Sequence, residues 1–142
     1  MLRQISVFLE NKPGKLYEFV KVLKKNDINM RALCLAEVAE YGVLRVIVDD
    51  PYELSQVLKE EDYIFRMTPV LGVTIEDKPG ALVDILDALA KAGINLEYTY
   101  AFTASVPGEA YIILRVNDVE GGAKALSKAG IRLLEEEDVA RL

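Results

Sequence analysis

The chain has 142 residues, of which 51% are apolar, and it carries a formal charge of −6. These numbers allow one medium domain or two small ones, and the excess of acidic residues excludes most proteins that bind nucleic acid through its phosphates. The sequence contains no histidine and a single cysteine, Cys34, which excludes Ser-His or Cys-His catalysis and an intramolecular disulfide.

The sequence also lacks the signals of a membrane protein. No apolar run approaches the roughly 18 residues that a membrane span needs, and Gln4 and Ser6 interrupt the only N-terminal stretch that could imitate a signal peptide. We therefore expect a cytoplasmic protein that starts at Met1 or Leu2, with no membrane partner, no nucleic-acid partner, no metal and no cofactor.

The periodicity of apolar residues predicts the secondary structure. Each half has the order strand, helix, strand, strand, helix, strand. The first half has expected strands at 2–9, 30–37, 42–49 and 63–67 and helices at 15–25 and 52–60; the second has strands at 70–76, 95–103, 110–117 and 131–134 and helices at 80–92 and 119–128. This α+β order predicts two ferredoxin-like βαββαβ domains, each with a four-stranded antiparallel sheet and two helices on one face. The acidic end from Glu135 onward is expected to be a short helix or a frayed terminus.

The two halves are copies of each other. The run NKPGKL at residues 11–16 returns as DKPGAL at residues 77–82, a displacement of 66 positions, and Ile28-Asn29-Met30 returns as Ile94-Asn95-Leu96 at the same displacement. The strands that follow are displaced by 68, which predicts a two-residue insertion in the hairpin around 105–108. We therefore predict two domains, at residues 1–68 and 69–142.

The junction between the copies is short. Only Thr68 and Pro69 separate two predicted strands, too few residues for a flexible linker. The two domains must therefore dock, and pairing their sheets side by side into eight strands would cover open edges.

The repeated Lys-Pro-Gly turn stands at the start of a helix in both copies. Asn11 or Asp77 could accept the backbone N–H of Gly14 or Gly80 as an N-cap, while the following proline has no N–H to leave unpaired. The remaining N–H groups and the positive end of the helix dipole would suit a carboxylate. A well-capped helix without a ligand explains the motif equally well.

The strand, the Asp/Asn-x-Pro-Gly-x-Leu turn and the amphipathic helix ending in Gly-Ile-Asn-Leu resemble the ACT domain, twice over nearly the whole chain. The second copy matches more closely, since the first has Asn11 and Asp27 where the family has aspartate and glycine. The resemblance implies a free-standing tandem ACT protein that binds an amino acid between paired domains and regulates a partner, and not an enzyme. A second copy of the chain, as a homodimer, and a metabolic enzyme are the expected protein partners.

The resemblance also implies the ligand-binding residues, in the turn of each copy and on its second strand. They are Asn11, Lys12, Pro13, Gly14, Lys15, Leu16, Asn29, Met30 and Cys34, and Asp77, Lys78, Pro79, Gly80, Ala81, Leu82, Asn95, Leu96, Tyr98 and Tyr100. Because only Asp77 is charged, we expect the second loop to bind more tightly.

Other readings remain open. Tyr98, Tyr100 and Phe102 could form a pocket wall, or they could belong to an ordinary core or interface. Cys34 is expected to behave as a small buried apolar residue. The main alternative function is a protein interaction module without a small ligand. A ferredoxin-like enzyme has no supporting nucleophile or metal cluster, and RNA binding conflicts with the acidic charge.

Overall fold

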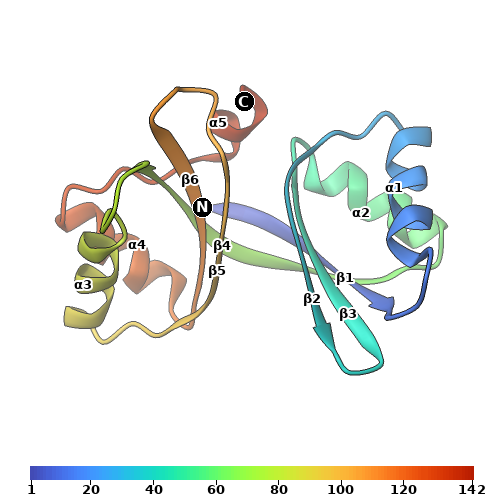
Figure 1. The fold of residues 1–142 in the computed structure, drawn as a ribbon, viewed down its shortest axis with the longest axis horizontal. Coiled ribbons are helices and arrows are strands. Elements are labelled where there is room, and N and C mark those ends of the chain that lie inside the picture. Colours follow the sequence, from blue (N-terminus) through green and yellow to red (C-terminus); the bar gives the residue numbers. More distant parts are fainter. The chain divides into compact units, whose positions relative to one another are not determined.

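The computed structural model describes the backbone of residues 1–142 and every side chain except that of Thr103. The chain forms two compact units. The N-terminal unit is Arg3–Thr68, and the C-terminal unit is Pro69–Leu142 together with Met1–Leu2. Figure 1 labels the elements of both units.

The N-terminal unit has the predicted βαββαβ order. Its elements are β1 (Leu2–Glu10), α1 (Lys15–Lys25), β2 (Met30–Val38), β3 (Tyr41–Val48), α2 (Pro51–Glu60) and the first part of β4 (Ile64–Glu76). β3 lies between β2 and β1 and is antiparallel to both, with Leu44 opposite Val7 on one side and Leu35 on the other. β1 is in turn the neighbour of β4. The ferredoxin-like prediction is confirmed for this unit.

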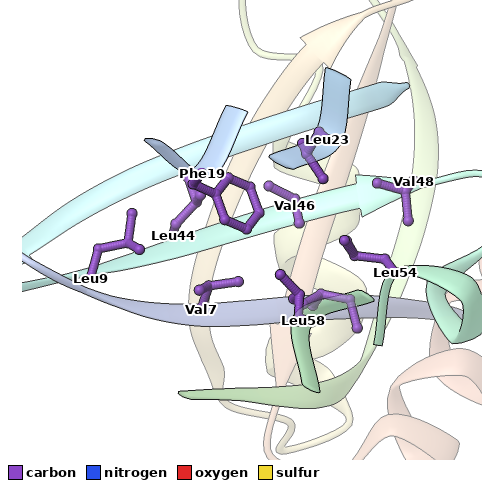
Figure 2. Close-up of a cluster of buried hydrophobic side chains, with 10 residues drawn as sticks. Val7, Leu9, Phe19, Leu23, Leu44, Val46, Val48, Leu54 and Leu58 are labelled. Atoms are coloured by element: carbon purple, nitrogen blue, oxygen red, sulfur yellow. The ribbon is translucent and has the colours of Figure 1, made fainter. Parts of the chain in front are cut away.

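The core of the N-terminal unit lies between its sheet and its two helices. Figure 2 shows Phe19 and Leu23 of α1 over the apolar side chains of β1 and β3, with Leu54 and Leu58 of α2 beside them. The ring of Phe19 meets that of Tyr63 edge to face, with ring centres 5.6 Å apart. These side chains are fixed because every one of the four helix residues is at most 2% exposed.

The C-terminal unit repeats the plan. Its elements are the rest of β4, then α3 (Val83–Lys91), β5 (Leu96–Thr103), β6 (Glu109–Val116), α4 (Val119–Lys128) and a terminal helix α5 (Glu136–Ala140). β6 pairs antiparallel with both β4 and β5. Ile85 and Leu89 of α3 and Leu126 of α4 are buried against Leu71 and Leu114 of the sheet.

The duplication is visible in the irregularities of the two sheets. The β2–β3 ladder is interrupted between Met30 and Ala32, and the β5–β6 ladder is interrupted between Leu96 and Tyr98, which are 66 positions later. The hairpins differ, because residues 39–40 connect β2 to β3 whereas residues 104–108 connect β5 to β6. The insertion expected near 105–108 therefore lies in this second hairpin.

The prediction of eight strands was wrong, since the chain forms six. The strands expected at 63–67 and 70–76 are one strand, β4, because Thr68 before Pro69 is restricted to extended backbone and the chain does not turn there. The strand expected at 131–134 is reduced to an isolated bridge between Val73 and Leu133. The helix expected from residue 80 begins at Val83, after a turn.

The two ends of the chain cover the face of the C-terminal sheet that points away from α3 and α4. Leu2, Leu134 and Val139 are each at most 3% exposed. Gly72 leaves space for them, since a Cβ atom there would lie 2.7 Å from Cδ1 of Leu2 and 3.2 Å from Cβ of Leu134. The N-terminal ammonium group lies 2.7 Å from the carboxylate of Glu135. Among the described residues, no helix is both long enough and apolar enough to span a membrane.

Candidate functional site

The turn between β1 and α1 is tied to the β2–β3 hairpin. The backbone N–H of Asn11 donates to the carbonyl oxygen of Glu40, 2.9 Å away, and the side-chain amide of Asn11 donates to the carbonyl oxygen of Ala39, 3.1 Å away. Gly14 then takes φ = 84°, a left-handed conformation that costs glycine little, and α1 begins at Lys15. The turn is therefore fixed next to the β2–β3 hairpin by two hydrogen bonds.

The predicted N-caps were wrong. Neither α1 nor α3 has a side chain that accepts a hydrogen bond from its first turn. The reason is that α1 begins after Gly14 and α3 begins after Leu82, whereas Asn11 and Asp77 stand directly after the preceding strands, too far from the first helical turn to cap it. Both residues join the neighbouring hairpin instead, through their backbone N–H groups.

Backbone N–H groups are left over at the start of α1. Within the turn, Lys12 donates to Glu10, Lys15 donates weakly to Lys12 at 3.4 Å, and Glu18 donates to Gly14. In the described part of the chain, no hydrogen bond is formed by the N–H groups of Gly14, Leu16 and Tyr17. Such groups at a helix start favour an anion.

A pocket of about 520 Å³ opens beside this turn. Its walls come from the end of β1, the turn, the first residues of α1, the end of β2 and the start of β3. They are Leu9, Glu10, Asn11, Lys12, Gly14, Lys15, Leu16, Tyr17, Leu35, Ala36, Glu37 and Gly42. Its size falls in the range of small-molecule sites.

The lining of this pocket combines both charges with apolar surface. The ammonium group of Lys12 donates a hydrogen bond to Glu10 at 2.8 Å, which lowers the pKa of the Glu10 carboxyl and raises the pKa of Lys12. Lys15 lies 3.5 Å from Glu18, while Glu37 forms no ion pair with any described residue. Leu35 is 48% exposed and supplies apolar wall.

The structure brings together part of the predicted first site. Asn11, Lys12, Gly14, Lys15 and Leu16 line the pocket. The residues that lie elsewhere are Pro13, Asn29, Met30 and Cys34.

The reason differs between these residues. Asn29 and Met30 follow the far end of α1, and Met30 packs against the core. Cys34 is opposite Arg45, on the sheet face that points away from the helices.

Sequence reasoning missed several lining residues, above all Leu35, Glu37 and Tyr17. Leu35 pairs with the core residue Leu44, so it lies on the helical face of β2. The alternation of β2 places residues 33, 35 and 37 on the face opposite that of Cys34, but the sequence does not show which of the two faces meets the helices.

The second loop is arranged differently. Gly80 has φ = 80°, and Asp77 donates its backbone N–H to Gly108 at 2.8 Å. Lys78 and Ala81 line a smaller pocket of about 260 Å³ that also includes Asp84 and Arg132. Asp77, Pro79, Gly80 and Leu82 are not part of its lining.

The remaining residues of the predicted second site lie away from the loop. Tyr98 and Tyr100 pair with Arg115 and Ile113, on the face opposite the helices. Leu96 packs against the core.

Asn95 joins the end of β6. Its backbone N–H donates to the side chain of Asn117 at 2.9 Å, and its carbonyl oxygen accepts the backbone N–H of Asn117 at 3.1 Å. Among the described residues, no group of three or more Cys, Asp or Glu side chains is arranged to hold a metal ion.

The family model described as "ACT domain pair" matches residues 1–142. A solved structure of protein BT0572 from Bacteroides thetaiotaomicron is 36% identical, with a TM-score of 0.92, over 99% of this chain and 96% of that one. No curated protein matches.

Two more distant structures share the fold. The ligand-free regulatory subunit of aspartate kinase from Thermus thermophilus has 18% identity and a TM-score of 0.62, over 90% of this chain and 92% of that one. Aspartate kinase from Clostridium acetobutylicum, described as an allosteric enzyme, has 12% identity and a TM-score of 0.57, over 90% of this chain and 32% of that one.

Proposed function

The chain belongs to the ACT domain pair family, and from this premise we propose that it is a regulatory protein that binds a free amino acid in the pocket of the N-terminal unit. One observation carries the proposal. The pocket places unbonded backbone N–H groups, two lysines, two glutamates and an apolar wall around a single space.

The carboxylate of the amino acid would bind at the start of α1. The N–H groups of Gly14, Leu16 and Tyr17 form no hydrogen bond with described residues, and the positive end of the helix dipole lies there. Gly14 has no atom within 4 Å of where a Cβ would be, so the ligand can approach the backbone closely. Lys12 and Lys15 add positive charge to the same rim.

The opposite wall would receive the rest of the ligand. Glu37 lines the pocket and forms no ion pair with a described residue, so its carboxylate can accept the ammonium group. Asn11 donates through its amide nitrogen to Ala39, which leaves its side-chain oxygen as an acceptor. Leu16 and Leu35 offer apolar surface to the ligand side chain. This lining favours an amino acid with an apolar side chain.

The output would be a change in how the protein associates. The turn and the β2–β3 hairpin are joined at Asn11, so a ligand that contacts both would favour one arrangement of β2. Such a change requires that the ligand bind one state more tightly than the other. The protein whose association changes would be a second copy of the chain or a metabolic enzyme. Fold similarity to the regulatory subunit of aspartate kinase supports a regulatory role.

Thermal unfolding with each of the twenty common amino acids tests the proposal. A ligand at about 100 times its dissociation constant stabilises the folded state by about 2.7 kcal/mol, which raises the midpoint by several degrees. Lys15→Gln should weaken the binding of the hit about tenfold in calorimetry. Lys24→Gln removes the same charge from the other end of α1 and is the matched control. The proposal would be contradicted if no amino acid raised the midpoint, or if Lys15→Gln and Lys24→Gln lowered the affinity equally.

A second candidate is a protein interaction module. The position of β2 favours this function, because β2 is an edge strand of the sheet. Two of its apolar side chains, Leu33 and Val38, are each 48% exposed. Sedimentation velocity on Leu33→Ser and Val38→Ser discriminates between the two functions. The interaction module would be favoured if these variants lost self-association and no amino acid raised the midpoint of thermal unfolding.

A further inference from the structure

The two features that distinguish the second repeat from the first meet at one place. The longer hairpin at residues 104–108 and the segment after Leu134, which includes α5, both belong to the C-terminal unit. Figure 1 shows α5 close to the β5–β6 hairpin. Residues of the longer hairpin and of the segment after Leu134 line one pocket, so the two segments that are absent from the first repeat form a single site.

This hairpin–tail pocket has a volume of about 500 Å³. It lies on the sheet face opposite α3 and α4, since Thr74 and Tyr111 are cross-strand partners outside the helical core. Its lining residues are Thr74, Ser105, Val106, Glu109, Tyr111, Arg132, Leu134, Asp138, Arg141 and Leu142. It shares only Thr74 and Arg132 with the smaller pocket beside the second loop.

One pair of charges forms the wall of the pocket. Arg132 donates to Oδ1 of Asp138 at 2.8 Å, and Oδ2 of Asp138 accepts the backbone N–H of Glu135 at 2.8 Å. Each oxygen of the Asp138 carboxylate therefore accepts one hydrogen bond, and Asp138 connects the start of α5 to Arg132.

Two further charged side chains of the lining are available to a ligand. Among the described residues, neither Glu109 nor Arg141 forms an ion pair, and both line the pocket. Ser105 and Tyr111, which carry hydroxyl groups, and the apolar Val106 belong to the same lining. One free anion and one free cation around a small space match a molecule that carries both charges.

We propose that the hairpin–tail pocket is a second ligand site, which takes a small zwitterion such as a free amino acid. Its carboxylate binds the guanidinium of Arg141, which can donate two parallel hydrogen bonds, and its ammonium group binds Glu109. The ligand bridges β6 and the end of α5, two segments far apart in the sequence. The site is independent of the pocket beside Asn11, so the chain can respond to two ligands.

The experiment uses the full chain carrying Lys15→Gln, which weakens the first pocket. Thermal unfolding of this variant is measured with each of the twenty common amino acids as probes, and any hit is titrated by calorimetry. We expect at least one amino acid to stabilise it, with affinity lowered about tenfold or more when Arg141→Gln or Glu109→Gln is added. Lys128→Gln, at the end of α4, is the matched control and should leave the affinity unchanged.

Hydrogen exchange gives a second readout. The hit should slow exchange at residues 136–140 in the Lys15→Gln chain and fail to do so after Arg141→Gln. The proposal is overturned if no amino acid stabilises the Lys15→Gln chain, or if a hit binds equally well without Arg141 and Glu109. A hit that Lys15→Gln alone abolishes would support the proposed function and reject this second site.

Discussion

The side-chain amide of Asn11 donates a hydrogen bond to the carbonyl oxygen of Ala39, 3.1 Å away, and so connects the ligand turn to the β2–β3 hairpin. The corresponding residue of the C-terminal unit is Asp77, whose ionised side chain cannot donate. There the connection depends on the backbone bond from Asp77 to Gly108. The two turns therefore differ in how firmly their side chains hold the neighbouring hairpin.

Asn11→Asp should lower the free energy of unfolding by about 0.5–1.5 kcal/mol, because it removes the donor and places a carboxylate near the carbonyl oxygen of Ala39. The bond is exposed to solvent, so the lower end of this range is expected. Urea denaturation monitored by circular dichroism measures the change. The reciprocal variant, Asp77→Asn, is the control and should not lose stability. Equal behaviour of the two variants would contradict this account.

The same difference concerns ligand binding. The charge of Asp77 alone predicted tighter binding at the second loop, and no observation tests that prediction. The pocket geometry leads to the opposite expectation, since Asn11 lines a pocket of about 520 Å³ whereas Asp77 does not line the smaller pocket beside its loop. We expect Asn11→Ala to weaken binding of an amino acid several-fold in calorimetry, and Asp77→Ala to have a smaller effect. A larger loss in Asp77→Ala would restore the argument from charge.

Gly72→Ala should destabilise the C-terminal unit by about 1–3 kcal/mol through overpacking. The added methyl group would lie 2.7 Å from Cδ1 of Leu2 and 3.2 Å from Cβ of Leu134, and both leucines are buried. The midpoint of urea denaturation measures the loss.

The double variant Leu2→Ala, Gly72→Ala is the control for this packing explanation. Leu2→Ala alone creates a cavity and should also destabilise the fold. If the methyl group at residue 72 clashes with Leu2, the double variant will be more stable than the sum of the single effects predicts. Additive losses would show that backbone effects at Gly72, and not contact with Leu2, cause the destabilisation.

Much of the fold could be predicted from the sequence because local and tertiary preferences agree. The helix at 15–25 begins and ends where its apolar period does, and Phe19 and Leu23 are buried as that period requires. The continuous strand at the junction is not predictable, because Thr68 and Pro69 suit a connector and extended backbone equally well.

The candidate site was predictable only in its turn. Residues 11–16 form a recognisable motif, and five of them line the pocket. The sequence shows the alternation of β2 but not which set of its side chains meets the helices. Leu35 and Glu37 of β2 line the pocket, whereas Cys34 does not. The hairpin–tail pocket was not predictable, because it depends on how the C-terminal segment packs beside the β5–β6 hairpin.

The ring of Tyr63 packs edge to face against that of Phe19. Its burial, and to a lesser extent the negative charges of Glu18 and Glu61, raise the pKa of its hydroxyl above the ordinary value of 10.0. Because the folded protein holds this proton more tightly than the unfolded chain, the contribution to stability is complete below about pH 10 and is lost as the pH rises through the folded-state pKa.

Tyr63→Phe keeps the ring and removes the ionisable group. The difference in free energy of unfolding between the two proteins should be constant from pH 8 to about pH 10 and should then shift in favour of the variant. Urea denaturation at a series of pH values measures this difference, and the lysines that titrate in the same range cancel because both proteins contain them. Parallel stability curves up to pH 11 would show that burial of Tyr63 does not oppose its ionisation.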